Sequence, residues 1–246
     1  MDAVSVKQWI QREIHKRGFN GTCGVASFSE VYNNLMPIQQ QEVKKACDIF
    51  FNTLLNKGSI ISIAIFHTEH AIKSINVHAG DKVDYERWSF YADEYNRLNN
   101  ALNDVCAKLT SILDGVPLRA TSELGNKVRL VEEYYPFAKI SHRVVAEYAG
   151  IGFRGKHELI VTKQNGPAVR LNSFITPIEL EKDEQIENLC GDCKACLDSC
   201  KILQRKAELR NYRQQCMEKI NVINSRYPVC GVCLRACYEN GSWKKC

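Results

Sequence analysis

The feature that most constrains this chain is a group of eight cysteines within residues 190–237. They are spaced Cys190-x2-Cys193-x2-Cys196-x3-Cys200, then Cys216, then Cys230-x2-Cys233-x3-Cys237. Eight thiolates are the ligand count of two 4Fe–4S clusters, because four cysteines hold each cluster of this kind. The pattern therefore predicts an electron-transfer module in this part of the chain.

The first run has the spacing in which three thiolates bind one cluster and the fourth reaches its neighbour. A two-residue gap lets a turn wrap around one corner of a cluster, whereas the longer last step is about one helical turn and directs the fourth sulfur elsewhere. Gly191 and Gly231 follow the leading cysteines and permit the close backbone approach that amide-to-sulfide hydrogen bonds need. We assign one cluster to Cys190, Cys193, Cys196 and Cys237, and the other to Cys200, Cys216, Cys230 and Cys233.

Two other uses of the same cysteines are less favoured. Cys-x2-Cys repeated twice is also a zinc-ribbon signature. Zinc modules place their cysteine pairs apart, however, whereas four cysteines in one short run would compete for the same ion. A disulfide framework needs an oxidising compartment. No charged segment followed by an apolar one precedes Gly18, so we expect no secretion signal and a cytoplasmic location.

The composition is that of an ordinary globular protein. With 246 residues, of which 45% are hydrophobic and 25% charged, the chain can form one sizeable core and a small appended module. No apolar run approaches the ~20 residues that span a membrane, so we expect no membrane association. The net charge of +5 is spread along the sequence and is compatible with an anionic partner without demonstrating one.

Hydrophobic periodicity predicts helices and strands in an irregular order. Helices are expected at 5–17, 29–35, 39–56, 83–113 and 140–148, where 83–113 forms one helix or two. Strands are expected at 19–26, 59–66, 116–120, 157–162 and 168–175. The last two strands flank a turn signal at 164–167, which indicates a hairpin. Such an order favours an α+β sandwich over a doubly wound sheet. An acidic connector at 179–187 leads into the cysteines, so we expect two domains, 1–177 and 178–246.

A second motif lies between the predicted helix 140–148 and the hairpin. It reads Ala146-Glu147-Tyr148-Ala149-Gly150-Ile151-Gly152-Phe153-Arg154-Gly155-Lys156-His157. With the eight cysteines behind it, this stretch resembles the epoxyqueuosine reductases and the related reductive dehalogenases. In that family an A-G-x-G-W/F-x-G/A-K-N/H segment precedes a double-cluster ferredoxin module, and a lone cysteine in the place of Cys216 completes the second cluster.

The resemblance implies a corrinoid, cobalamin, held in a nitroreductase-like α/β sandwich that is followed by a ferredoxin-like module with two 4Fe–4S clusters. It also implies that the nearer cluster passes electrons to cobalt, which acts on a carbon–oxygen or carbon–halogen bond. The residues expected to contact the corrinoid are Gly150, Gly152, Phe153, Gly155, Lys156 and His157. Glycines there let backbone amides approach a large ligand closely. The alternative is that they only end a helix and begin a strand.

Reductive cleavage needs a proton donor, because the departing oxygen or carbanion must be neutralised. The aspartate proposed for this role in the epoxyqueuosine reductases has no counterpart, since no aspartate lies between Asp114 and Asp183. Four side chains in or near the corresponding stretch are our catalytic candidates: Glu133, Tyr134, Tyr135 and His142. Lys156 is a further candidate for the proton donor.

These features predict an iron–sulfur, cobalamin-dependent reductase supplied by an external low-potential electron donor of the ferredoxin or flavodoxin type. The sequence ends nine residues after Cys237, without the C-terminal helical repeats with which family members grip tRNA. We therefore expect a short paralogue with a small-molecule substrate rather than tRNA. Two alternatives stay open: an electron-transfer or corrinoid-reducing protein without its own substrate, and a zinc-stabilised nucleic-acid binder.

Overall fold

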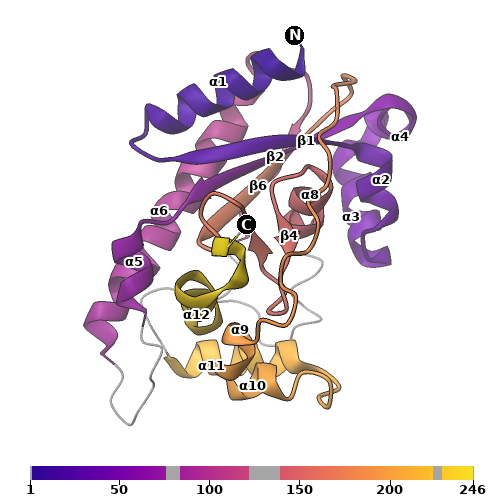
Figure 1. The fold of residues 1–246 in the computed structure, drawn as a ribbon. Coiled ribbons are helices and arrows are strands. Elements are labelled where there is room, and N and C mark those ends of the chain that lie inside the picture. The colour runs from indigo at the N-terminus through magenta and orange to yellow at the C-terminus, as the bar shows by residue number, and fades with distance from the viewer. Residues whose placement is uncertain (1, 76–83, 122–138, 224–228, 246) are drawn as a thin grey trace.

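A four-stranded antiparallel sheet lies at the centre of the fold, with helices on both faces (Figure 1). The computed structural model describes residues 2–75, 84–121, 139–223 and 229–245. The strands stand in the order β1-β2-β6-β3, and a separate small sheet pairs β4 with β5. Their bounds are Gly21–Ser27 for β1, Ser59–Phe66 for β2, Val116–Pro117 for β3, Phe153–Arg154 for β4, Ile160–Val161 for β5 and Val169–Thr176 for β6.

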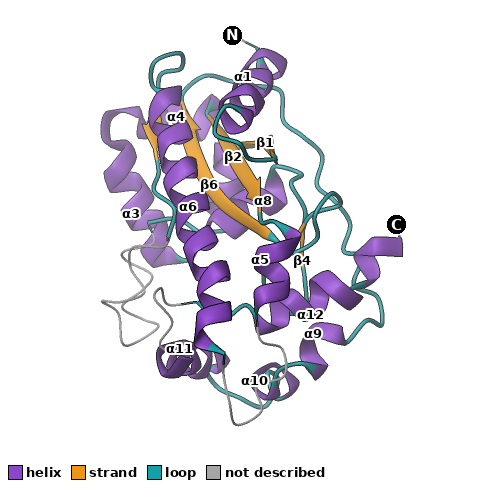
Figure 2. Cartoon of the chain, turned by 90° about the vertical axis from the view of Figure 1, so that its left-hand side faces the viewer, coloured by secondary structure: helices purple, strands orange, loops and turns teal. Residues whose placement is uncertain are grey.

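The helices form a layer on each face of this sheet and a group at one end of it (Figure 2). One face is covered by α1 (Ala3–His15) and α6 (Tyr85–Leu109), and the other by α2 (Phe28–Asn33), α3 (Pro37–Cys47), α4 (Phe51–Lys57) and α8 (His142–Tyr148). A short η1 (Asp48–Phe50) joins α3 to α4, and α5 (Glu69–Ser74) follows β2. The group at the end of the sheet consists of α9 (Ala195–Asp198), α10 (Lys201–Gln204), α11 (Tyr212–Ile223), α12 (Val232–Asn240) and η2 (Ser242–Lys245).

The central strand β2 is buried on both faces, as its apolar and β-branched sequence predicts. Successive side chains of a strand point to opposite faces. Ile60 and Ala64 accordingly join the core beneath α2, α3, α4 and α8, whereas Ile61 and Ile63 join the core beneath α1 and α6. The sheet is therefore the buried middle layer of a sandwich.

The fold is a mixture of helices and sheet, as predicted, but the hairpin predicted between 157–162 and 168–175 is wrong in its pairing. Thr162 and Gly166 exchange two backbone hydrogen bonds of 2.9 and 3.0 Å, so the turn itself forms. Beyond the turn, however, β5 pairs with β4, while β6 pairs with β2 along its whole length. An isolated hairpin is only marginally stable, whereas β6 gains two strand neighbours and two covered faces in the middle of the sheet.

The acidic connector lies along the open edge of β1. The backbone amide of Asp183 donates to the carbonyl of Val25 at 2.9 Å, and the amide of Val25 donates to a carboxylate oxygen of Asp183 at 2.8 Å. Lys7 in α1 forms an ion pair with the same carboxylate at 2.5 Å. The connector thus covers an edge strand that would otherwise present unpaired backbone groups.

The cysteine-bearing end is packed against α5 and α6. Ile72, Ile75 and Trp88 form one buried cluster with Val229 and Val232. The indole Nε1 of Trp88 also donates a hydrogen bond of 2.8 Å to the carbonyl of Cys230. Apolar burial and a direct hydrogen bond therefore hold the cysteines in a defined position relative to the sheet. Within the described ranges, no helix has the length and apolar character needed to cross a membrane.

Candidate metal centre

The eight cysteines come from several short elements that meet at one end of the sheet. Cys196 lies in α9, Cys216 in α11, and both Cys233 and Cys237 in α12. Cys233 and Cys237 are about one helical turn apart and therefore lie on the same side of α12. That helix packs against α9, which brings the two cysteine-rich runs together.

Four of the cysteines, called here the first cysteine set, line one cavity: Cys190, Cys193, Cys196 and Cys237. Burial raises the pKa of the Cys237 thiol, and the nearby thiols of Cys196, Cys190 and Cys193 raise it further. Burial and the neighbouring Cys190 and Cys193 likewise raise the pKa of Cys196 to about 11. Thiols that oppose one another's ionisation in this way need a positive centre between them to become thiolates.

The other four, called here the second cysteine set, lie beside the first: Cys200, Cys216, Cys230 and Cys233. Burial raises the pKa of Cys233 well above its ordinary value, and the thiols of Cys230, Cys216 and Cys200 add to this, with a smaller effect from Cys196 of the first set. Part of Cys216 is exposed, but burial of its thiol, together with Cys230 and Cys200, raises its pKa to about 11. Cys233 thus stands between the two sets.

Backbone amides already point at several of the sulfurs. Burial opposes ionisation of Cys193, yet its pKa is lowered overall by the amides of Ala195 and Ser242, the Ser242 hydroxyl and the charge of Lys156. Burial raises the pKa of Cys230, and a hydrogen bond from the amide of Val232 acts against this rise. Amide-to-sulfur hydrogen bonds stabilise thiolates and the clusters that thiolates hold.

Left-handed backbone at two glycines shapes the cysteine turns. Gly191 has φ +43° and Gly231 has φ +76°. These are the glycines that follow the leading cysteine of each run, and residues with a Cβ rarely adopt this conformation.

Each site offers four cysteine thiols, which is the donor set of a 4Fe–4S cluster. Among the residues that the structure describes, none of the cysteines forms a disulfide, and no group of three His, Cys, Asp or Glu side chains is arranged to hold a single metal ion. In their donor chemistry, the two sets of four thiols fit 4Fe–4S clusters.

The glycine motif predicted to contact a corrinoid lies between the sheet and the first cysteine set. A Cβ on Gly150 would approach the carbonyl oxygen of Glu184 to 2.3 Å, and a Cβ on Gly152 would approach that of Val161 to 2.3 Å. The close approach at these two glycines is thus to the protein's own backbone. Phe153 is buried in one cluster with Cys196 and Cys237.

Lys156 and His157 are directed toward the first cysteine set. The ammonium of Lys156 donates to the carbonyls of Gly191 at 2.6 Å and Cys193 at 3.0 Å. The ring of His157 lines the same cavity as the cysteines. Burial lowers the pKa of His157 to about 4, so its imidazole is neutral. The G-K-H part of the motif is therefore part of the surroundings of the cysteines.

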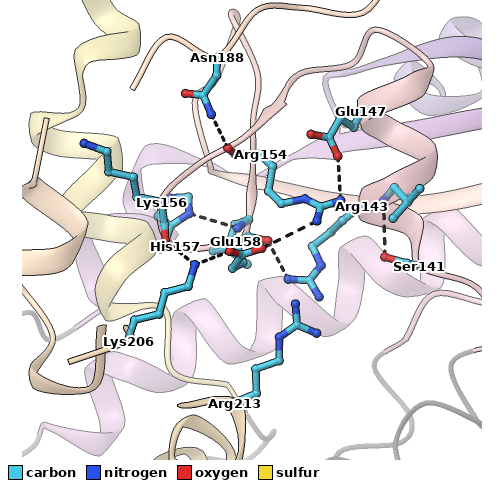
Figure 3. A network of polar contacts seen from close by, with 12 residues as sticks. Ser141, Arg143, Glu147, Arg154, Lys156, His157, Glu158, Asn188, Lys206 and Arg213 are labelled. Atoms are coloured by element: carbon cyan, nitrogen blue, oxygen red, sulfur yellow. Dashed lines mark hydrogen bonds and ion pairs between the residues drawn. The ribbon is translucent and has the colours of Figure 1, made fainter. Parts of the chain in front are cut away.

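A charged network joins this motif to the helices that carry the second set (Figure 3). Glu158 forms an ion pair with Lys206, which follows α10, and lies 3.9 Å from Arg154. Arg143 in α8 donates to the carbonyl of Glu158 at 2.7 Å. Burial opposes ionisation of Glu158, but Lys206 and Arg154 lower its pKa overall. The network connects α8, the β4–β5 turn and the cysteine-bearing helices.

Of the four catalytic candidates, the structure describes only His142. Glu133, Tyr134 and Tyr135 lie outside the described residues. His142 is buried beneath the sheet, where its Nε2 donates to the carbonyl of Arg119 at 3.0 Å and its Nδ1 lies 2.8 Å from the Ser173 hydroxyl. Burial lowers its pKa to about 4. With both ring nitrogens engaged, His142 joins β6 to the end of the 116–121 segment.

One cavity borders the glycine motif. It holds about 310 Å³ and is lined by Asn34, Val144, Glu147, Tyr148, Arg154 and Gln185, so it includes none of the six residues expected to contact a corrinoid.

Sequence reasoning missed Trp243 and Ser242. Trp243 lines the cavity of the first cysteine set, and its Nε1 donates to the carbonyl of Cys237 at 2.9 Å. The signal available in the sequence was a glycine, Gly241, that ends α12 only four residues after Cys237. A chain that stops its helix there turns back over the cluster ligand it has just supplied.

No model of a known protein family matches this chain. Curated relatives are named epoxyqueuosine reductase. The relative from Vibrio cholerae is 46% identical over 70 residues, which cover 27% of this chain and 19% of the relative. The relative from Lactococcus garvieae is 26% identical over 170 residues, which cover 67% of this chain and 43% of the relative. A solved epoxyqueuosine reductase from Streptococcus thermophilus aligns with a TM-score of 0.53 and 18% identity over 95% of this chain and 66% of that one. The chain thus spans less than half the length of these curated relatives. The resemblance to the epoxyqueuosine reductases is confirmed, and the fold is similar over nearly all of this chain.

The predicted preference for a small-molecule substrate over tRNA is wrong. The finding that overturns it is that the curated relatives carry the name epoxyqueuosine reductase. The prediction rested on where the sequence ends, and a chain end says nothing about the ligand of the parts that are present.

Proposed function

We propose that this chain is an iron–sulfur oxidoreductase related to the epoxyqueuosine reductases, with one 4Fe–4S cluster on each cysteine set. The observation that carries this proposal is the arrangement of eight cysteines as two adjacent sets of four, the first of which lines one cavity. When bound, such clusters supply electrons one at a time at potentials that the protein sets.

The chain's own residues contribute burial and hydrogen-bond donors to these sites. Cys196 and Cys237 are buried, which limits solvent access to the first set. The amides of Ala195 and Ser242 favour the thiolate of Cys193, and Lys156 holds the loop that carries it. A site that shields its cluster while offering N–H donors to sulfur suits repeated one-electron transfer.

The finer arrangement is part of the same proposal. Residues 1–177 would form a nitroreductase-like sandwich and residues 178–246 a ferredoxin-like module, supported by the similarity of fold to an epoxyqueuosine reductase. An external low-potential carrier would supply electrons. Cobalamin binding stays a prediction, which a spectral titration with cobalamin would test.

We propose that the substrate is a tRNA-borne epoxide of the epoxyqueuosine kind. Support comes from the names of the relatives and from a net charge of +5, which favours a polyanion. A binding titration with tRNA at two salt concentrations tests this part, since phosphate contacts make affinity fall steeply with salt. Affinity that is absent, or that does not change with salt, would contradict it.

Metal analysis of anaerobically purified protein tests the proposal most directly. We expect about eight iron atoms and as much acid-labile sulfide per chain, with the broad visible absorbance of iron–sulfur centres. Cys233→Ser should lose iron from the second set. Cys106→Ser is the matched control, because Cys106 is also buried but packs in the core between α6 and the sheet. Zinc in place of iron, or equal iron loss in both variants, would refute the proposal.

A further inference from the structure

The imidazole of His157 has a buried nitrogen with no partner. Only 5% of the residue is exposed, and its Nε2 lies out of contact with water and makes no hydrogen bond to any described residue. Buried polar groups in folded proteins are nearly always paired, because an unpaired donor costs about 1–3 kcal/mol. Such a nitrogen therefore points to an acceptor that the polypeptide does not itself supply.

The protonation of this ring follows from its other nitrogen. The backbone amide of Leu159 donates a hydrogen bond of 3.1 Å to Nδ1 of His157. An amide can only donate, so Nδ1 carries a lone pair and the single ring proton resides on Nε2. The orphaned atom is thus a hydrogen-bond donor.

The ring lies at the site of the first cysteine set. His157 lines the cavity of the first cysteine set, together with Cys190, Cys193, Cys196 and Cys237. Gly155 makes room for the ring, because a Cβ at this position would lie 2.7 Å from its Cε1 atom. The neighbouring Lys156 is tied to the loop of Cys193. The acceptors that a bound cluster would place in this cavity are sulfurs.

We propose that Nε2–H of His157 donates a hydrogen bond to a sulfur of the cluster held by the first cysteine set and raises its reduction potential relative to a chain without this donor. The inference rests on the proposed iron–sulfur function and adds to it a residue in direct contact with the cluster. The hydrogen bond stabilises the reduced cluster more than the oxidised one, because the reduced cluster carries one more negative charge.

The test compares three variants after anaerobic cluster assembly. His157→Leu removes the donor, His157→Gln restores an N–H donor of similar reach, and His15→Leu changes an exposed histidine of α1 as control. Iron and sulfide are counted first, and the two midpoint potentials are then measured by redox titration followed by electron paramagnetic resonance. In His157→Leu we expect the equilibrium constant for reducing one cluster to fall about tenfold, which is about 59 mV for a one-electron couple. The other cluster should be unaffected, His157→Gln should recover part of the loss, and His15→Leu should match the wild type.

Full iron content with both potentials unchanged in His157→Leu would overturn the inference while leaving the iron–sulfur proposal intact. If His157→Leu does not retain its cluster, a measurement on the wild-type protein tests the inference instead. In wild-type protein labelled with nitrogen-15 in histidine, pulsed electron paramagnetic resonance of the reduced clusters should show a protonated histidine nitrogen coupled to one cluster. The lack of such coupling would refute the inference. Wild-type protein without iron would refute the proposed function itself, and the inference with it.

Discussion

Replacing Gly231 by alanine tests how tightly the second cysteine turn is packed against the sheet domain. Gly231 has φ +76°, and a Cβ there would lie 2.7 Å from Cδ1 of Ile75 and 2.9 Å from Cε1 of Tyr91. The left-handed backbone costs a residue with a Cβ about 1–2 kcal/mol. Overpacking of a close-packed contact adds about 1–3 kcal/mol. We therefore expect the free energy of unfolding to fall by about 2–5 kcal/mol in Gly231→Ala.

Gly18 offers a matched control for this substitution. It has the same φ of +76°, but a Cβ there would meet no atom within 4 Å. Gly18→Ala should therefore show only the backbone cost of about 1–2 kcal/mol. Urea denaturation of metal-free protein measures both. If Gly231→Ala loses no more stability than Gly18→Ala, the turn does not pack against Ile75 and Tyr91, and the account of how the module is held is incorrect.

Three further predictions concern single contacts. Lys156→Met removes the hydrogen bonds to the carbonyls of Gly191 and Cys193. A chelator should therefore extract iron from the first cysteine set of this variant faster than from that of the wild type, while iron loss from the second set is unchanged. Equal rates of iron loss in the variant and the wild type would contradict this. Trp88→Phe leaves the Cys230 carbonyl without its donor and should cost about 1–3 kcal/mol in urea denaturation, and a change within about 0.5 kcal/mol would show that the bond contributes little. Lys16 and Arg17 lower the pKa of Glu13 from 4.5 to about 2. Its contribution to stability should therefore be complete above pH 4.5 and be lost as the pH falls toward 2; Glu13→Gln should flatten the stability profile in that window, unlike Glu42→Gln, which changes an exposed i,i+3 pair.

Local patterns were sufficient for much of the fold. The apolar run at 59–66 predicts β2, because only a strand covered on both faces suits such a sequence. The apolar positions of 83–113 likewise predict α6. Both signals are repeated along a continuous segment, so they do not depend on which partner the segment meets. The hairpin prediction was wrong for the opposite reason. The partner of β6 is β2, about a hundred residues earlier in the sequence, and no local sequence pattern indicates this pairing.

The sequence by itself determined which atoms are available for metal chemistry: eight cysteines with a spacing that suits two clusters. Only the tertiary structure decided what surrounds them. It placed the G-K-H motif on the first cysteine set, turned Trp243 back over Cys237, and left one buried nitrogen of His157 without a hydrogen-bond partner among the described residues. Spacing along the chain sets the reach of neighbouring ligands, whereas burial and hydrogen bonding between distant segments depend on how sheet and helices pack, and that packing sets the environment of a metal site.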